Sequence, residues 1–271
     1  MAPVSTQNSS IIRPVSAALG RSPALERLAW ALGSLFVLGV LWQIAADFVQ
    51  NRYFPSPAAV FAVLRQEAMA GELFAHVGAT LERVALAFAI AMLIGSSIGL
   101  LLGRFKLADK FFDPWLILVL NLPALVIISL SYVWLGMNTA ASVIAVAINQ
   151  IPNVAVTMRE GARSLSRDLA EMADVYKFGW KKTFLHVTLP QLAPFLAAAA
   201  RSGLALVWKI VLVVEALGGS GRGVGYQIYI AFGEFDVTKI LAYALAFIFI
   251  VQIIETTVLQ PIQARVNRWR R

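Results

Sequence analysis

The feature that most constrains this chain is a stretch of 45 residues, Pro114 to Met158, without a single charged side chain. A membrane-spanning helix needs about 20 apolar residues to cross ~30 Å of hydrocarbon. The stretch is therefore too long for one span and suits two. Over the 271 residues, 59% are hydrophobic and 14% are charged, whereas soluble domains average about 25% charged residues. The sequence predicts an all-α polytopic membrane protein.

Four more apolar stretches bring the expected number of transmembrane helices to six. The long stretch is cut at Gly136–Thr139, and Pro123 and Pro152 are expected inside its two helices, where neighbouring helices tolerate kinks. Residues 95–103 carry two overlapping GxxxG repeats, which predict a tightly packed helix. Ala58–Met69 has mixed polarity and is expected to form an interfacial helix outside the membrane. The other spans are expected at Leu28–Ala46, Val84–Gly103, Leu192–Val214 and Ile240 to about Leu259.

Basic residues gather in alternate loops, which fixes an expected orientation. Most of the 23 Lys and Arg residues lie in the N-terminal tail (1–27), the loop after the second span, residues 159–182 and the C-terminus. Cytoplasmic loops carry such an excess, so both termini are expected in the cytoplasm. The formal net charge of +8 then reflects membrane sorting and not a nucleic-acid partner. The opposite loops hold only Arg52, Arg65, Arg222 and Lys239.

The longest polar interval, about 160–190, is expected to contain an amphipathic helix. One helical face would carry Leu165, Leu169, Met172, Ala173 and Tyr176, and another Arg167, Glu171 and Asp174. Asp168 and Ser166 compete as the N-cap residue. Pro190 cannot continue a hydrogen-bonded helix and is expected to mark an exit. From periodicity alone, this helix would lie on the bilayer surface.

This interval resembles the cytoplasmic "EAA" loop of permease subunits of bacterial ATP-binding-cassette (ABC) importers. The family pattern is Glu-Ala-Ala, three residues, Gly, nine residues and Ile-x-Leu-Pro. With Leu189-Pro190 as the anchor, Glu171–Ala173 match Glu-Ala-Ala and Val187 matches Ile. Lys177 stands where the family has Gly, a turn position with φ > 0 that is costly for Lys, and Gly179 is the candidate to make that turn instead. From about Phe54 to Trp269, the chain looks like the taurine, sulfonate and nitrate branch.

The resemblance implies a transmembrane domain over 28–271, in the inner membrane of a bacterium, after a cytoplasmic tail at 1–27. It implies four kinds of partner: two copies of an ATPase subunit, a second copy of this permease, a periplasmic or lipid-anchored solute-binding protein, and membrane lipid. It places the Gly-rich residues 218–225 near the outer mouth, although their spacing by itself predicts only an external loop of tight turns. It assigns ATPase coupling to Arg167, Asp168, Glu171, Ala173, Asp174, Lys177, Gly179 and Pro190.

The sequence contains no signature of catalysis. There is no Cys, no HExxH and no GxxxxGK[ST] phosphate loop. His76 and His186 have no ligand spacing around them and are read as ordinary loop or interface residues. No metal, cofactor or enzymatic activity is therefore expected. If transport is driven by ATP, the nucleotide site lies on another subunit.

Charged and amide side chains at membrane depth are candidates for a translocation path, because ionised groups are costly there. Lys209 would favour an anionic solute such as a sulfonate or carboxylate. Alternatively it forms an ion pair with Glu215 or Glu255, and Arg201 pairs with carbonyls. The ion-coupled secondary carrier and the non-transporting scaffold remain alternative functions. The candidate path residues are Arg83, Asn121, Asn149, Arg201, Trp208, Lys209 and Glu215.

Overall fold

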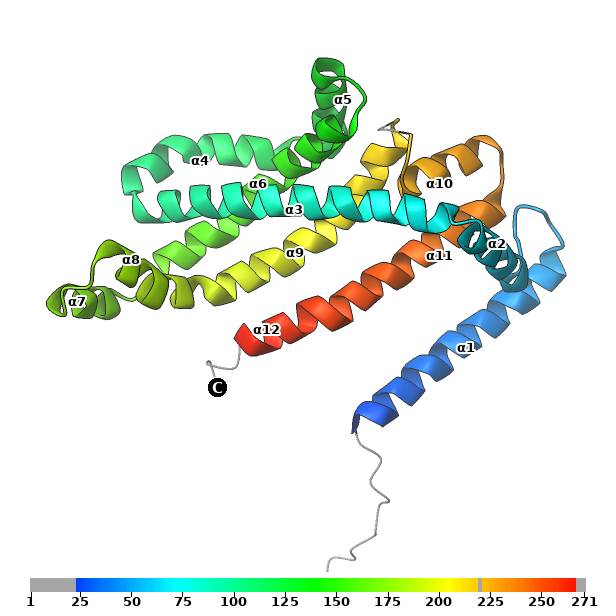
Figure 1. Ribbon diagram of the computed structural model, residues 1–271, viewed down its shortest axis with the longest axis horizontal. Coiled ribbons are helices and arrows are strands. Elements are labelled where there is room, and N and C mark those ends of the chain that lie inside the picture. Colours follow the sequence, from blue (N-terminus) through cyan, green and yellow to red (C-terminus); the bar gives the residue numbers. More distant parts are fainter. Residues whose placement is uncertain (1–22, 219–220, 267–271) are drawn as a thin grey trace, which may run out of the picture. The chain divides into compact units, whose positions relative to one another are not determined.

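The computed structural model describes residues 23–218 and 221–266, and Figure 1 shows that most of these residues are helical. No strand occurs among the described residues. The chain divides after Val49 into two units, which are described separately. The predicted tail up to residue 22, Gly219 and the C-terminal Arg268, Arg270 and Arg271 lie outside the described residues.

The first unit is the single helix α1 (Pro23–Val49). Its residues 29–49 are long and apolar enough to cross a membrane, which agrees with the expected span at 28–46. Gln43 on this helix donates a hydrogen bond to Asp47 one turn later (2.9 Å).

The second unit begins with α2 (Pro57–Met69) and α3 (Glu72–Arg104). The Ser56 side chain accepts a hydrogen bond from the Ala59 backbone and Pro57 occupies the first turn, so α2 forms where the mixed polarity predicted it. Gly71, at φ 83°, makes the turn into α3. The 33 residues of α3 span about 50 Å. This helix thus starts well before the predicted residue, Val84.

The third span is broken, not kinked. It consists of α4 (Lys106–Asn121) and α5 (Ala124–Leu135), which meet at a bend of 92°. The expectation of Pro123 inside a helix is wrong because its ring disfavours the helical conformation for the preceding residue, and Leu122 is extended at ψ 127°. The described residues therefore contain five helices long enough to span a membrane, or six spans if the bent pair counts as one.

The cut before the fourth span is confirmed. Gly136, at φ 78°, ends α5, and the Asn138 side chain caps α6 (Thr139–Arg163) by accepting from the Ala141 backbone (2.8 Å). Pro152 lies within α6 as predicted.

The fifth span starts earlier than predicted. After α7 (Arg167–Val175), α8 (Trp180–Thr183) passes through a π-helical turn (Phe184–Thr188) into α9 (Leu189–Ala216), so 180–216 forms the span. Pro190 is not an exit but lies directly after the π-helical turn, inside the continuous helix 180–216, where neighbouring helices allow a proline. Beyond it lie α10 (Val224–Gly233), which replaces part of the expected loop of turns, α11 (Val237–Ile254), a π-helical turn (Glu255–Leu259) and α12 (Gln260–Val266).

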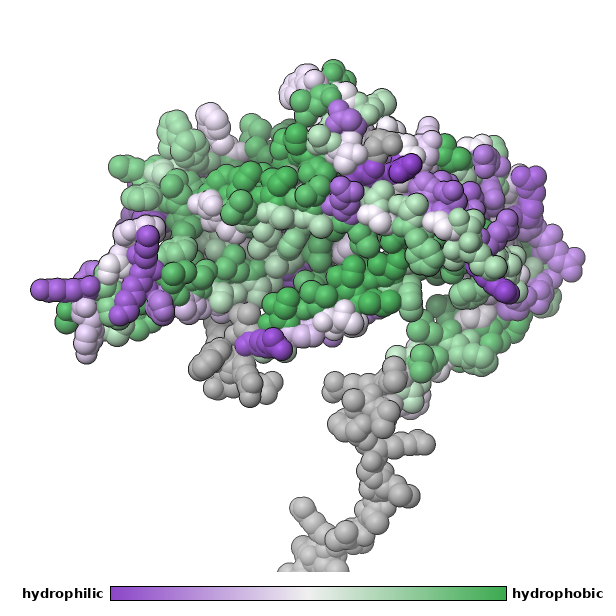
Figure 2. All heavy atoms as spheres, viewed as in Figure 1, coloured by the Kyte–Doolittle hydropathy of each residue, from purple (hydrophilic) through white to green (hydrophobic). Residues whose placement is uncertain are grey.

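The core of the second unit forms where α3, α6 and α9 pack together. The GxxxG glycines of α3 face α6 at very close range: a Cβ added to Gly95 would lie 2.7 Å from the Val154 Cβ, and one added to Gly99 2.6 Å from the Met158 Cβ. The predicted tight packing is therefore confirmed. Figure 2 shows hydrophobic residues over the middle of this unit, with hydrophilic residues around α7 and α8 at one end and around α2 and α10 at the other.

Candidate functional site

The segment that resembles the EAA loop forms a short, well-anchored helix. Of the two candidate N-cap residues, Ser166 caps α7, because its side chain accepts from the Leu169 backbone (3.4 Å). Asp168 lies in the first turn, where a carboxylate favours the helix dipole. The Ser166 backbone donates to the Gln191 side chain (2.9 Å), which ties the start of this loop to α9.

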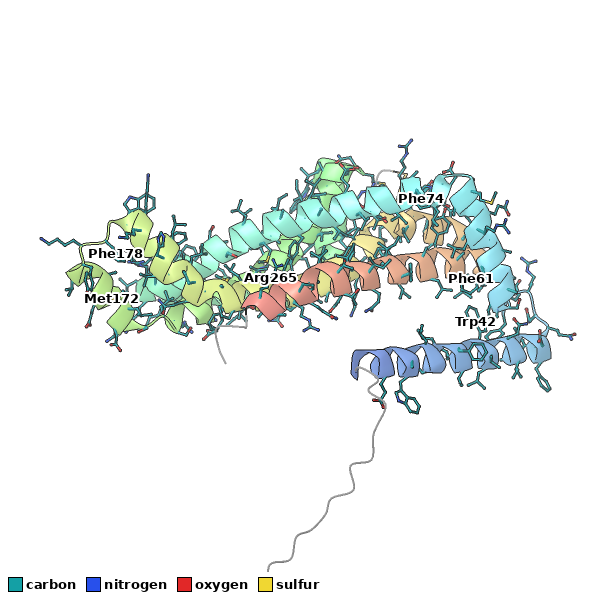
Figure 3. The ribbon with its side chains drawn as sticks, turned by 60° about the horizontal axis from the view of Figure 1, so that its bottom comes forward. Trp42, Phe61, Phe74, Met172, Phe178 and Arg265 are labelled. Carbon is teal, nitrogen blue, oxygen red and sulfur yellow. The ribbon has the colours of Figure 1, made fainter. Side chains whose placement is uncertain are left out.

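The exposed surface of α7 is both charged and apolar. Ala173 is fully buried, but Leu169, Met172 and Tyr176 of the predicted apolar face are exposed. The charged residues Arg167, Asp168, Glu171 and Asp174 are exposed too. In Figure 3, Met172 and Phe178 lie at the same end of the unit. Exposed apolar side chains rimmed by charges are typical of a protein-binding surface.

The turn after α7 forms at Lys177 and not at Gly179. Lys177 has φ 50°, and Gly179 has the ordinary value of −68°. The Lys177 backbone donates to the Asp174 carbonyl (3.0 Å) and the Phe178 backbone to the Ala173 carbonyl (2.8 Å), as in a helix C-cap. The left-handed turn of the family pattern is therefore kept despite the lysine, and the expectation that Gly179 takes it over is wrong.

A buried polar network occupies the opposite end of the unit. Arg83 on α3 forms an ion pair with Glu215 on α9 and donates to the Arg222 carbonyl (2.7 Å). Glu215 also accepts from the Thr80 hydroxyl and the Gly225 backbone, each at 2.9 Å. Each of these hydrogen-bond partners of the Glu215 carboxylate, all among the described residues, is thus a donor. The network joins α3, α9 and the Gly-rich segment.

His76 and the glycines complete this network. The Gly223 backbone donates to His76 Nδ1 (3.1 Å), and the Val224 backbone donates to the Thr80 hydroxyl (2.9 Å). Cβ atoms added to Gly223 or Gly225 would collide with Glu215. The glycines therefore let the backbone pass directly over a buried carboxylate. Sequence reasoning named Arg83 and Glu215 but missed this pairing, for which the available signal was the Gly-rich segment that begins three residues after Glu215.

Lys209 pairs with neither of its proposed carboxylates. Glu215 pairs with Arg83, and Glu255 lies 3.4 Å from Arg201. Lys209 itself is exposed on α9, and no ion pair or hydrogen bond involves it within the described residues. The neighbouring Trp208 is buried edge-to-face against Phe247, with ring centroids 5.7 Å apart.

The two amide candidates lie on different helices. The exposed Asn121 side chain donates to the Ile117 backbone carbonyl one turn earlier in α4 (2.7 Å). Asn149 is half-buried on α6, and its backbone carbonyl accepts from the Asn153 side chain (3.4 Å). Within the described residues, no hydrogen bond or ion pair joins Lys209 or these amides to the Arg83–Glu215 pair. The predicted path residues therefore do not form one cluster in a single copy of the chain.

Comparisons with known proteins agree with this architecture. The family described as "Binding-protein-dependent transport system inner membrane component" matches residues 84–270. The putative aliphatic sulfonates transport permease protein SsuC of Bacillus subtilis is 27% identical over 93% of this chain and 92% of its own length. The taurine transport system permease protein TauC of Escherichia coli is 25% identical over 92% of both chains. The bicarbonate transport system permease protein CmpB of Synechococcus elongatus is 26% identical over 79% of both.

A solved structure shows the same fold. A chain of the inward-facing MetNI methionine ABC transporter superposes with a TM-score of 0.63 and 19% identity, covering 74% of this chain and 99% of that one. These findings favour the importer interpretation over the ion-coupled carrier and the scaffold. The chain belongs to the family of binding-protein-dependent transport system inner membrane components and is the permease subunit of an ABC importer.

Proposed function

We propose that two copies of this permease form the translocation path for a small anionic organic or inorganic solute, which a binding protein delivers and two ATPase subunits drive across the membrane. The relatives are named for sulfonates, taurine and bicarbonate. All three contain an anionic group. The observation in this chain that carries the proposal is the exposed ammonium group of Lys209 on a membrane-spanning helix.

The position of Lys209 suits a solute path. Lys209 lies seven residues before the end of α9 at Ala216, about 10 Å along the helix axis. Arg201, Ala205, Lys209 and Val213 follow one another at four-residue intervals and are all exposed. An ammonium group facing hydrocarbon costs ~2.5–3.5 kcal/mol at the bilayer centre. A water-filled path shared with a second copy would remove this cost and place a positive charge beside the solute.

The test is solute uptake into vesicles that contain the whole transporter and its binding protein. The panel comprises an alkanesulfonate, bicarbonate, a neutral sugar and a cationic amine. We expect uptake of an anion, a loss of that uptake in Lys209→Met and its retention in Lys209→Arg. Lys106→Met, which changes an exposed lysine at the start of α4, is the matched control. A preferred neutral or cationic solute, or wild-type anion uptake by Lys209→Met, contradicts the proposal.

We assign ATPase coupling to α7 and the turn that follows it. The exposed Arg167, Glu171 and Asp174 would contact a groove on the ATPase subunit, as short amphipathic helices do with their partners. Asp168 would support the N-terminus of α7 and Ala173 its packing. Lys177, Gly179 and Pro190 would shape the connection to α9. Exposed apolar side chains beside these charges support a protein partner.

We infer the orientation in the membrane from the same assignment and from the charge of the loops. α7 and α8 lie at one end of the second unit, and α10, which begins within the Gly-rich segment, lies toward the other (Figure 1). If α7 contacts an ATPase subunit, the α7 end of the permease lies on the cytoplasmic side of the bacterial inner membrane. The basic loops predict the same orientation. Both termini are then cytoplasmic, and the binding protein docks near residues 218–225. Single-cysteine labelling of the cysteine-free chain at Lys106 and Asn138 should report opposite sides.

A further inference from the structure

A cluster of five charged residues joins α4 to α6 at the α7 end of the unit. Asp109 and Asp113 are four residues apart on α4, and Arg159 and Arg163 are four residues apart on α6. Residues at this spacing share one helix face. The two carboxylates therefore meet the two guanidinium groups across the helix–helix contact, with Glu160 beside them.

The contacts form a continuous network. Arg159 donates to Asp109 (3.2 Å) and to Asp113, and its Nε lies 3.7 Å from Glu160. Arg163 pairs with Asp109 and with Glu160 (2.9 Å). The Arg159 and Asp109 side chains are only 13% and 17% exposed. Asp113, Arg163 and Glu160 at its edge are 41%, 43% and 54% exposed. A network with a shielded centre is stronger than isolated surface ion pairs, which contribute little.

Apart from this cluster, α4 is held loosely. None of its residues is buried. An apolar pocket of about 420 Å³, partly open to the outside, lies between α4, α3 and α6, with Leu102, Trp115 and Ile151 among its walls. Close packing of side chains is what normally fixes a helix in place. The position of α4 is therefore set at its first turns, by charge pairing with α6.

The cluster stands between the coupling segment and the broken span. Only Ser164, Leu165 and Ser166 separate Arg163 from α7. At the far end of α4, Leu122 and Pro123 form the 92° bend into α5. A displacement of α7 that moves the end of α6 would pull the start of α4 with it and change the angle at the bend.

We propose that Arg159 and Arg163, with Asp109 and Asp113, are positioning residues that transmit movement of the coupling segment to the α4–α5 broken span. The inference rests on the proposed contact of α7 with the ATPase. Neither arginine touches nucleotide or solute. Their role is to make α4 follow α6, so that ATP hydrolysis and solute passage stay linked.

The test uses the complete transporter in nanodiscs or vesicles, with Arg159→Gln, Asp113→Asn and the swapped pair Arg159→Asp with Asp113→Arg. Three quantities are measured: co-purification of the ATPase subunit, ATP hydrolysis, and solute uptake per ATP. We expect the single variants to retain association with the ATPase subunit and ATP hydrolysis. Their solute uptake per ATP should fall about tenfold, which is the size of a typical coupling between two sites. The swapped pair should recover part of that loss. Arg104→Gln, an exposed arginine that ends α3 at the same end of the unit, is the control.

A second measurement follows the helices directly. Spin labels at Lys110 and Ser164, with a cysteine-free ATPase partner, report the distance between the start of α4 and the end of α6, and singly labelled variants identify the distances between copies. We expect one narrow distance in the wild type with and without ATP, and a broad distribution in Arg159→Gln. Unchanged uptake per ATP in Arg159→Gln, or a distance that stays narrow, overturns the proposal. So does loss of ATPase association in Arg159→Gln, because the cluster would then serve assembly only. Failure of the α7 assignment appears separately, as normal ATPase association in Glu171→Ala.

Discussion

Arg83 on α3 and Glu215 on α9 form an ion pair that is almost entirely shielded from solvent: 3% of the surface of Arg83 and 0% of that of Glu215 is exposed. The pair lies 132 residues apart in sequence, and its donors and acceptors include the backbone of the Gly-rich segment. A buried pair of this kind contributes little relative to apolar side chains, but leaving one charge unpaired is costly. It therefore specifies one position of that segment against α3.

Removing one member of this pair should destabilise the permease strongly. Arg83→Met leaves the Glu215 carboxylate buried without its counter-charge, and we expect a loss of about 3–5 kcal/mol. The double variant Arg83→Met with Glu215→Gln should lose less than Arg83→Met alone. Thermal unfolding in detergent measures both losses. A double variant that is no more stable than Arg83→Met would show that the pair is not the source of the effect.

The close approach of α3 and α6 makes a prediction about two glycines on the same helix. Gly99→Ala should destabilise by about 1–3 kcal/mol, because its Cβ would lie 2.6 Å from the Met158 Cβ. Gly78→Ala is the matched control, since nothing lies within 4 Å of an added Cβ there, and it should stabilise by roughly 0.5–1 kcal/mol through helix propensity. Equal melting temperatures for the two variants would contradict this packing.

The turn at Lys177 can be tested by restoring the glycine of the family pattern. Lys177 has φ 50°, a conformation that costs an L-residue about 1–2 kcal/mol and glycine almost nothing. Lys177→Gly should therefore be tolerated and stabilise by up to about 1 kcal/mol, after allowance for the greater flexibility of unfolded glycine. Gly179→Ala should also be tolerated, since Gly179 has an ordinary φ and open space around it. A clear loss of stability in Lys177→Gly would refute the strained turn.

A pH dependence is expected where α2 meets α11. Burial raises the pKa of Glu67, but hydrogen bonds from Tyr243 (2.6 Å) and Lys239 (3.3 Å) more than offset this, so the pKa lies below its usual value. A depressed carboxyl pKa contributes stability above the unfolded value of about 4.3, and this is lost as the pH falls through the folded pKa. The difference in melting temperature between wild type and Glu67→Gln should be present at pH 7 and shrink below about pH 4.3. A difference that does not vary with pH contradicts the ionised pairing.

The membrane spans could be predicted from sequence because the length of an uncharged stretch can be read directly from consecutive residues. The uncharged stretches predicted the helices, and the GxxxG repeats predicted that α3 is tightly packed, but that α6 is its partner comes from the structure. Pro152 was predicted correctly within α6, but Pro123 and Pro190 were misjudged, because proline is compatible with several outcomes. Pro123 lies between α4 and α5, and whether a proline stays within a helix depends on neighbouring helices that can satisfy freed carbonyls.

Long-range pairings could not be predicted in the same way. The sequence shows charges at membrane depth but not their partners. Glu215 and Glu255 were therefore only alternative partners for Lys209, whereas in the structure Arg83 and Arg201 pair with those carboxylates. The cluster that joins Asp109 to Arg159 and Arg163 bridges about fifty residues and has no local signal. The charge and hydrogen-bonding groups of each candidate residue are known from the sequence, but its partner depends on the fold.

Glu171 provides the most direct test of the coupling surface. Its side chain is exposed on α7, so Glu171→Ala should change the free energy of unfolding by under ~0.5 kcal/mol and leave insertion intact. If α7 lies in a groove on the ATPase, the same substitution removes a charge from the contact, and both ATPase association and solute uptake should fall. Glu82→Ala, which removes an exposed glutamate on α3, is the control and should retain both. Normal substrate-stimulated ATP hydrolysis by the Glu171→Ala transporter would place the ATPase contact elsewhere on the chain.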